Sequence, residues 1–463
     1  MNQDLTKVPP FERAALEQVF DLFQDDLTSE ELKDTLQTTN AGDIKNCLTN
    51  AVEILSNDLL LRDALKYNEM TQHIDVVRKL PWERKSSSLP LTDFDVESIQ
   101  LYIEETYELF SSKKLIEEAI DIVATRRKYH PVRDYLNSLK WDGNERIRYA
   151  LHKFLGADTS DYTCEALKLF MIGAISRVFT PGIKFDNTLV LVGAQGAGKS
   201  SFFRLLSVND DWFSDDLRDL ESNSVFEKLQ GHWIIELSEM LATNNAKSTE
   251  AIKSFLSRQK ESYRTPYAQH SEDRPRQCVF AGTTNKVSFL PNDRSGNRRF
   301  LPVACNEKEA EVFILDDEKS SREYISQMWA EAMDLYKKGK YQLSLSPALE
   351  DAAKASQKAF MQEDVNSGLI LSYMKECSEE KVCSAYLLKY ALNNPSPNPA
   401  RWEYTEVNEI MNTLIANGDL VGWRYFSNPK RFKEFGTQRG WEKVPSSVNE
   451  SVSTADHYRC QGN

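Results

Sequence analysis

The sequence contains a glycine-rich stretch that ends in a lysine and a hydroxyl residue. Residues 193–200 read GAQGAGKS and fit the pattern G-x-x-x-x-G-K-[ST] in full. Glycines let such a backbone turn back and point its N–H groups at phosphate oxygens, and the following helix adds its positive dipole end. Lys199 can then reach the β- and γ-phosphates of a nucleotide, and Ser200 can hold Mg²⁺. The residues expected to contact this ligand, ATP with Mg²⁺, are Gly193, Gln195, Gly196, Ala197, Gly198, Lys199, Ser200 and Ser201.

An apolar run that ends in two carboxylates lies about forty residues after this loop. Residues 232–239 read HWIIELSE, which predicts a strand that neighbours the strand before the loop. Glu239 can orient and deprotonate an attacking water, and Glu236 can serve on the metal side. Since side chains alternate between the faces of a strand, both can act only if the strand ends or bends near Ser238. An ion pair inside the domain is the alternative interpretation of Glu236.

An amide and a pair of arginines follow these carboxylates. Residues 279–285 read VFAGTTN and predict a third strand, after which Asn285 can position the water beside the γ-phosphate. A buried asparagine that only ties two strands together is the alternative. Arg298 and Arg299 come soon after, and a guanidinium supplied by a neighbouring subunit would neutralise charge in the transition state. A solvated basic turn is the alternative for this pair.

The elements that must position these residues change in character along the chain. From about residue 187, short apolar runs alternate with helical stretches, which is typical of an α/β fold with a parallel sheet. Strands are predicted at 189–192, 233–237, 279–281 and 300–303. The predicted parts are an acidic, mostly helical N-terminal region (1–128), a helical collar (129–186), a P-loop ATPase core (187–345), a small winged-helix-like α+β domain (360–445) and a flexible tail (446–463).

The winged-helix prediction depends on the order of elements near the C-terminus. Helices are predicted at 367–377, 382–392 and 405–416, followed by two aromatic runs, 423–426 and 432–441, about a turn at Asn428 and Pro429. In a winged helix the last helix would enter the major groove, and the ribbon would bring Lys430 and Arg431 to phosphates. A protein-docking module is the alternative, because the last helix carries Glu406 and Glu409 and no basic residue.

Charge is distributed unevenly along the chain. The balance of 57 basic and 70 acidic residues, net −13, speaks against a general nucleic-acid-binding surface. Residues 1–120 hold 24 acidic and 12 basic residues, whereas residues 253–299 hold ten basic and four acidic residues. This basic segment either meets phosphates, with Lys260, Arg264 and His270 facing DNA in a pore, or forms a solvated face. The chain has no apolar run of membrane-helix length, no signal-peptide pattern and seven scattered cysteines, so we expect a cytoplasmic protein without a membrane partner.

The order of these motifs resembles the virulence-associated protein E family. The similar segments are HPVRDYL (130–136), LKWDG (139–143) and PGIKFD (181–186) before the glycine-rich loop, and then WIIELSEM, GTTN and SGNRRF. Members are encoded by phages, pathogenicity islands and other mobile elements, and their core is similar to superfamily 3 helicases of the AAA+ class. The resemblance implies that Lys253, on a helix after the acidic strand, is functional; an exposed helix lysine is the alternative. Many relatives carry an upstream primase domain, whereas no cluster of metal-binding carboxylates is recognisable in the acidic N-terminal region.

Two functions remain open from the sequence. The first is an ATP-hydrolysing DNA motor of helicase type that forms a homo-oligomeric ring, expected to be hexameric, with single-stranded DNA in its pore. It would serve the replication of a phage or mobile element in the bacterial host cell. The second is a regulatory ATPase that interferes with phage or host factors without translocating on DNA. A nucleoside kinase shares the glycine-rich loop but gives no reason for a strand that ends in Asn285 or for the arginine pair.

Overall fold

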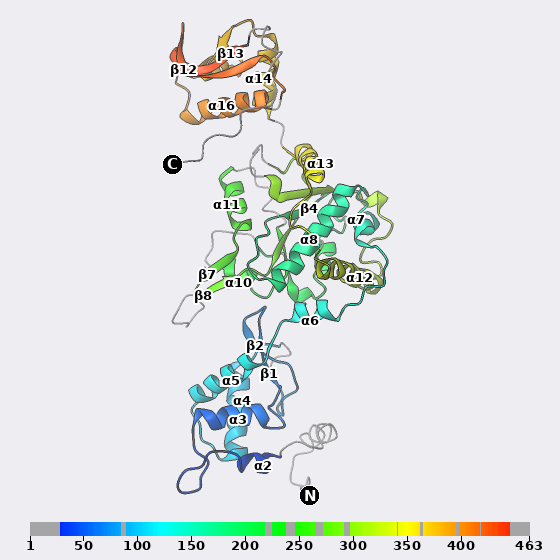
Figure 1. Cartoon of the computed structure of the whole chain (residues 1–463), viewed down its shortest axis with the longest axis vertical. Helices are drawn as coiled ribbons and strands as arrows, with labels where there is room; N and C mark the ends of the chain where they lie inside the picture. Colours follow the sequence, from blue (N-terminus) through cyan, green and yellow to red (C-terminus); the bar gives the residue numbers. More distant parts are fainter. Residues whose placement is uncertain are drawn as a thin grey trace. The chain divides into compact units, whose positions relative to one another are not determined.

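The structure is a computed structural model of the chain, and it divides into two compact units, residues 1–361 and 362–463 (Figure 1). It describes residues 28–84, 89–217, 225–237, 246–263, 272–290, 297–339, 341–361, 364–394, 396, 398–416 and 418–444. Within the described ranges, no helix has both the length and the apolar character needed to cross a membrane.

The N-terminal part of the first unit has a hydrophobic core of its own. Its helices are α2 (Ser29–Lys33), α3 (Leu48–Asn57), α4 (Asp93–Tyr107) and α5 (Lys113–Arg126). They accompany a small sheet of order β2-β1-β3, formed by β1 (Leu65–Asn68), β2 (His73–Val76) and β3 (Lys128–Tyr129). These strands are not evident from the sequence, because runs of two to four residues are too short to establish an alternation of polar and apolar side chains.

Three helices connect this part to the large sheet. They are α6 (Pro131–Ser138), α7 (Ile147–Leu155) and α8 (Asp161–Phe179). Helix α8 is buried along most of its length, contacts strands of the sheet and is capped at its N-terminus by Ser160, whose side chain accepts a hydrogen bond from Thr163 N. Residues 169–178 are buried without interruption, so the protein covers this part of the helix on all sides.

A five-stranded parallel sheet forms the centre of the first unit, as the alternation of strands and helices predicted. Its strands, in the order β10-β4-β9-β6-β5, are β10 (Phe300–Ala304), β4 (Thr188–Val192), β9 (Val279–Thr284), β6 (Ile234–Leu237) and β5 (Phe213–Ser214). Strands β4, β6 and β9 are buried throughout, which is typical of a parallel sheet covered on both faces. The expectation that the acidic strand neighbours β4 is wrong, because β9 lies between β4 and β6.

Helices and short segments surround this sheet (Figure 1). They are α9 (Lys199–Leu206), α10 (Val225–Leu229), α11 (Ala246–Leu256), α12 (Glu318–Lys337), α13 (Pro347–Ala359) and the short 3₁₀ turns η2 (Asp210–Trp212), η4 (Asn297–Arg299) and η5 (Glu307–Glu309). Trp233, directly before β6, stacks on Trp329 of α12 with ring centroids 4.4 Å apart. This stacking contact packs α12 against the sheet region.

The basic segment after α11 begins as a hairpin stem. Strands β7 (Lys260–Tyr263) and β8 (Glu272–Pro275) pair antiparallel, with Lys260 opposite Pro275 and Tyr263 opposite Glu272. Arg264 and His270, two of the predicted DNA contacts, lie outside the described residues. The hairpin is not evident from the sequence, because both faces of its strands carry polar residues and no alternation of polar and apolar side chains is visible.

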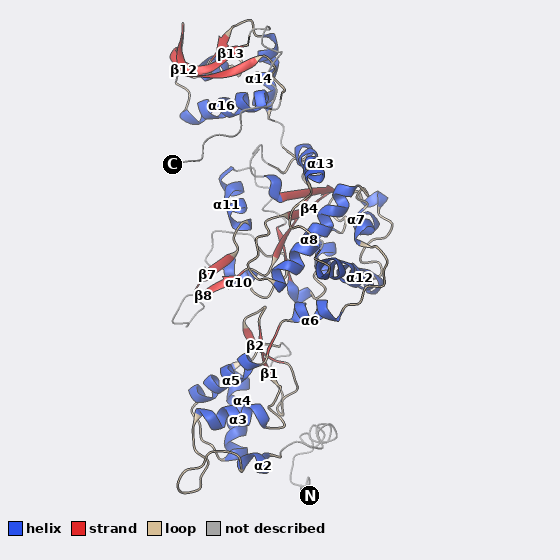
Figure 2. Cartoon of the chain, viewed as in Figure 1, coloured by secondary structure: helices blue, strands red, loops and turns tan. Residues whose placement is uncertain are grey.

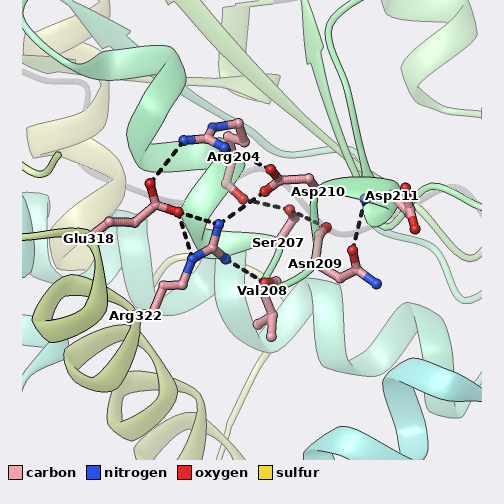
Figure 3. A network of polar contacts seen from close by, with 8 residues as sticks. All are labelled: Arg204, Ser207, Val208, Asn209, Asp210, Asp211, Glu318 and Arg322. Atoms are coloured by element: carbon pink, nitrogen blue, oxygen red, sulfur yellow. Dashed lines mark hydrogen bonds and ion pairs between the residues drawn. The ribbon is translucent and has the colours of Figure 1, made fainter.

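A network of charged side chains joins the end of α9 to the start of α12 (Figure 3). Arg204 of α9 pairs with Asp210 at 2.7 Å, and Arg322 of α12 pairs with Asp210 at 3.1 Å and with Glu318 at 2.7 Å. Arg322 also donates a 2.6 Å hydrogen bond to the carbonyl oxygen of Val208, whose φ is +72°. The helix that begins at Lys199 is therefore held at its far end.

The second unit is a small α+β domain in which strands β12 and β13 lie against helices (Figure 2). Its elements are α14 (Val365–Glu376), β11 (Lys381–Val382), α15 (Ser384–Tyr390), α16 (Arg401–Ala416), β12 (Trp423–Phe432) and β13 (Gly436–Lys443), with the sheet order β11-β13-β12. The predicted turn at Asn428 and Pro429 is wrong, because β12 continues through it with a shift of register between Phe426 and Lys430. A β-bulge accommodates a proline that a regular ladder would not.

Candidate functional site

The glycine-rich loop runs from the end of β4 to the start of α9. The backbone N–H of Gly193 donates a 3.1 Å hydrogen bond to Thr284 O at the end of β9. A Cβ atom at Gly193 would lie 2.6 Å from the carbonyl oxygen of Cys305, so only glycine fits between the neighbouring chain segments. Gly198 precedes α9 with a φ of +81°, in the left-handed region that favours glycine. The first backbone N–H groups of α9 therefore follow directly on this loop.

Lys199 folds back over this loop. Its Nζ donates hydrogen bonds to the carbonyl oxygens of Gly193 at 2.9 Å and Ala194 at 2.5 Å. The residue is mostly buried, and burial lowers the pKa of its ammonium group. Burial destabilises the charged form of Lys199, so a polyanion bound beside the ammonium group would stabilise that form.

A buried carboxylate is the next group of the site. Ser200 Oγ donates a 2.7 Å hydrogen bond to Oε1 of Glu236 at the end of β6, and Thr283 Oγ1 of β9 donates to the same oxygen. Only 1% of Glu236 is exposed, and its Oε2 has no hydrogen-bond partner. Burial raises the pKa of this carboxyl group above its ordinary value. Oxygen ligands with spare lone pairs are those that Mg²⁺ prefers, so Ser200 and Glu236 are suited to a divalent cation.

The loop and the ends of two strands surround a cavity of about 430 Å³. Gln195, Gly196, Ala197, Gly198, Lys199, Ser200, Ser201, Thr283, Thr284, Asn285 and Phe313 line it. Seven of the eight residues expected to contact the nucleotide therefore share one cavity with Asn285, and Gly193 lies at the base of the loop. Three of the lining residues were not predicted from the sequence. Thr283 and Thr284 precede the predicted amide in the same motif and could have been found there, whereas no pattern marked Phe313.

Arg298 and Arg299 lie at the opposite end of the strands from this cavity. They belong to η4, directly before β10, and Phe300 is paired with Thr188 at the start of β4, whereas the glycine-rich loop follows the end of β4. Arg299 Nε lies 3.2 Å from Asp186 Oδ2 and donates a 3.0 Å hydrogen bond to Ser257 Oγ. The Arg298 residue is exposed. The two arginines thus differ in environment, and neither is joined to the cavity within one chain.

The remaining predicted residues are dispersed. Glu239 lies outside the described residues, and Lys253 of α11 is 7% exposed, which contradicts the alternative of an exposed helix lysine. Lys260 is exposed and pairs with Asp273 across the hairpin stem. In the second unit, Lys430 pairs with Glu442, which also binds Arg424 at 3.0 Å, while Arg431 is exposed.

The HPVRDYL segment has a structural role that the sequence did not reveal. His130 begins α6, and its Nδ1 accepts a hydrogen bond from Arg133 N, so Nε2 donates to Gln277 Oε1 at 2.7 Å. Arg133 pairs with Glu69 at 2.8 Å and donates to Val178 O at 2.5 Å. Gln277 Nε2 also donates a 2.9 Å hydrogen bond to Glu69 O. These contacts connect the β1–β2 turn, α6 and α8 to the residue that leads into β9.

A family model agrees with the resemblance in the motifs. Residues 136–362 match the family model of the virulence-associated protein E-like domain. A comparison with curated proteins found no match. Two solved apo structures of the NrS-1 C-terminal region are similar at 15% and 13% identity, with TM-scores of 0.41 and 0.42, and each comparison covers 82% of this chain and 96% of that chain. Residues 136–362 are thereby identified as a virulence-associated protein E-like domain.

Proposed function

We propose that this protein is a P-loop ATPase with an AAA+-like core, related to superfamily 3 helicases, that moves along DNA during replication of a phage or other mobile element. The observation that carries the ATPase proposal is the convergence of Lys199, Ser200 and the buried carboxylate of Glu236 at one end of the sheet. A phosphate-binding loop alone serves many functions, whereas a carboxylate beside its serine supports nucleotide hydrolysis with a metal ion.

The residues present fit ATP and Mg²⁺. Lys199 and the backbone N–H groups at the start of α9 would hold the phosphates, and Ser200 and Glu236 would hold the cation. The unpartnered Oε2 of Glu236 supports this role, because a buried carboxylate oxygen is costly until it gains a partner. Bound there, Mg²⁺ would neutralise charge on the phosphate oxygens. Asn285, on the cavity wall, would orient the attacking water, and Glu239 would take its proton.

We further propose that Arg298 acts on the nucleotide of a neighbouring subunit. A five-residue strand separates its two ends by roughly 15 Å, so Arg298 lies at the opposite end of the strands from the loop of the same chain. Arg299 is held by Asp186 and Ser257, whereas the exposed Arg298 is available for a partner. The proposed assembly is a homo-oligomeric ring, hexameric by resemblance to superfamily 3 helicases.

DNA contacts are proposed for two surfaces. The β7–β8 hairpin, with Lys260 on its stem, would reach single-stranded DNA in the pore of the ring. The second unit has the element order of a winged helix, and its exposed Arg431 and Lys433 would contact phosphates. A specific observation favours a second candidate, a regulatory ATPase with a protein-docking unit. The acidic Glu442 binds both Arg424 and Lys430, which leaves less free positive charge on the ribbon.

ATP turnover measured with and without single-stranded DNA tests the proposal. We expect hydrolysis by the wild-type protein, stimulation by single-stranded DNA and displacement of a paired strand. Lys199→Ala should abolish turnover, and Glu239→Gln should retain bound ATP without cleaving it. Lys114→Ala, at an exposed lysine of α5, is the control and should keep full activity. Turnover by the Lys199→Ala protein would contradict the ATPase assignment, and hydrolysis indifferent to DNA would favour the regulatory candidate.

A further inference from the structure

An aromatic side chain stands exposed on the wall of the phosphate-loop cavity. Phe313 is 41% exposed and is the only large apolar residue among the described residues that line this cavity. A Cβ atom built on Gly198 would lie 3.2 Å from Phe313 Cε2, so the ring lies beside the start of α9. An exposed phenylalanine at the mouth of a polar cavity is costly without a partner.

The backbone on either side holds this ring in place. The N–H groups of Glu311 and Val312 both donate to Lys153 O of α7, at 3.0 and 3.2 Å, and Phe313 O accepts a 3.0 Å hydrogen bond from Asp316 N. The next residue, Ile314, is fully buried in the main core. The segment therefore presents a ring whose backbone is fixed before a ligand arrives, which lowers the entropy cost of binding.

The sheet order sets the direction in which a nucleotide would lie. Strand β4 and its loop lie between β10 and β9, and Phe313 follows β10 whereas Asn285 follows β9. The γ-phosphate end is marked by Asn285 and by Glu236 of β6, on the β9 side of the loop. The nucleoside end of the same ligand is thus directed to the side of Phe313.

We propose that Phe313 stacks on the base of the bound nucleoside triphosphate. This inference rests on the proposed function, since it needs a triphosphate on the glycine-rich loop. Every base presents a π-face, so the contact adds affinity without selecting one base. Loss of such a stack weakens binding by about 5- to 150-fold. The effect is the same in kind for ATP and GTP, and it is absent for a polyphosphate that carries no base.

Equilibrium binding of Mg·ATP, Mg·GTP and inorganic tripolyphosphate to the full chain tests the proposal by calorimetry. Phe313→Ala should weaken ATP and GTP by at least about fivefold and leave tripolyphosphate unchanged, while Phe313→Trp should retain both nucleotides. Unchanged tripolyphosphate binding also verifies that the variant is folded. The matched control is Val312→Ala, because the neighbouring valine is equally exposed at 41% but does not line the cavity. It should bind all three ligands as the wild type does.

The outcomes separate this inference from the proposed function. If the wild type binds ATP and Phe313→Ala binds it equally well, stacking is wrong and the ATPase proposal stands. The same conclusion follows if Phe313→Ala weakens ATP and tripolyphosphate alike, since the ring would then support the loop and not the base. If the wild type binds neither ligand, both the inference and the proposed function are overturned.

Discussion

The hydroxyl group of Ser200 donates a 2.7 Å hydrogen bond to Oε1 of Glu236, a residue that lies two strands away from the loop in the sheet. Strand β9 lies between them and contributes Thr283, which donates to the same oxygen. One carboxylate oxygen is thereby satisfied by two hydroxyl groups, while Oε2 is not. The protein without ligand carries a cost at Glu236 that a bound cation would offset.

The first prediction concerns the free energy of unfolding of the ligand-free protein at different pH values. Burial raises the folded-state pKa of Glu236. The protonated carboxyl group therefore contributes fully to the free energy of unfolding below the unfolded-state pKa, and this contribution is lost as pH rises through the folded-state pKa. Glu236→Gln should remove this loss and be more stable than the wild type at neutral pH by about 1 kcal/mol. It should also lose ATP turnover.

Urea unfolding from acidic to neutral pH, without Mg²⁺ or nucleotide, measures this difference. Glu105→Gln, at an exposed carboxylate of α4 in the N-terminal part, is the control and should parallel the wild type. Equal or lower stability of Glu236→Gln at neutral pH would show that the carboxylate is not penalised by its burial.

The second prediction distinguishes the two arginines of η4. Arg298→Ala should leave the free energy of unfolding unchanged and abolish ATP turnover, because the residue is exposed and would act on a neighbouring subunit. Arg299→Ala should lower the free energy of unfolding by about 1 kcal/mol, because it loses Asp186 and Ser257 as partners. Thermal or urea unfolding, together with steady-state hydrolysis, separates the two effects.

Mixing experiments extend this second prediction. A shared site requires that Arg298→Ala and Lys199→Ala subunits, each inactive alone, recover turnover when they are mixed, because some interfaces then contain one intact loop and one intact arginine. No recovery in the mixture would count against a finger that acts between subunits.

The third prediction concerns the buried ion pair at the base of the β7–β8 hairpin. Arg276 binds Glu261, and its guanidinium lies 4.7 Å from the ring centroid of Phe255 and 5.0 Å from that of Phe280. Both charged residues are buried, so Arg276→Ala would remove the buried partner of the Glu261 carboxylate, leave it only the exposed Arg258, and should cost about 3–5 kcal/mol of stability. Arg258, which is exposed and lies 3.6 Å from Glu261, is the matched control.

Chemical denaturation of both variants measures the third prediction. Arg258→Ala should cost about 1 kcal/mol or less, as expected for an exposed ion pair. Similar losses in the two variants would indicate that water reaches Glu261.

The fourth prediction concerns the network between α9 and α12 (Figure 3). Arg322→Ala should lower the free energy of unfolding by about 1–2 kcal/mol, because it removes contacts to Val208 O, Asp210 and Glu318 together. A β-branched residue at a φ of +72° costs about 1–2 kcal/mol, and Arg322 helps to hold that conformation. Val208→Gly should therefore recover part of the loss when it is combined with Arg322→Ala.

Calorimetric unfolding of the single and double variants tests the fourth prediction. Lys319→Ala, at an exposed neighbour of Arg322, should leave the melting temperature unchanged. A double variant less stable than Arg322→Ala would mean that the side chain of Val208 contributes more by packing than its backbone loses by strain.

The parts of the fold that could be predicted from the sequence are those with long apolar runs or a regular spacing of apolar residues. The predicted strands at 189–192, 233–237, 279–281 and 300–303 are present as β4, β6, β9 and β10, because each is a buried apolar run. The order of these strands in the sheet was not predictable, because an apolar run does not indicate which strands pair with it in a parallel sheet. The small strands β1, β2 and β3 and the hairpin stem were missed because they are short or polar on both faces.

In the candidate site, likewise, residues within a sequence motif were predictable and residues that reach the site only through tertiary contacts were not. Lys199 and Ser200 belong to a motif with fixed spacing, and Asn285 follows a strand whose burial could be foreseen. Thr283 reaches Glu236 only because β9 lies beside β6, and Phe313 reaches the cavity through a chain turn after β10. Contacts of this kind depend on tertiary arrangement, which local sequence does not encode.

The position of Arg298 and the glycine-rich loop at opposite ends of neighbouring strands also bears on how copies of the chain can associate. If one copy completes the next, the contact joins unlike surfaces, and repeating it builds a ring or an open chain of subunits. An open chain of subunits then has a free Arg298 surface at one end and a free glycine-rich loop at the other. Only a closed ring would complete every site, and a ring with one subunit missing would contain one incomplete site.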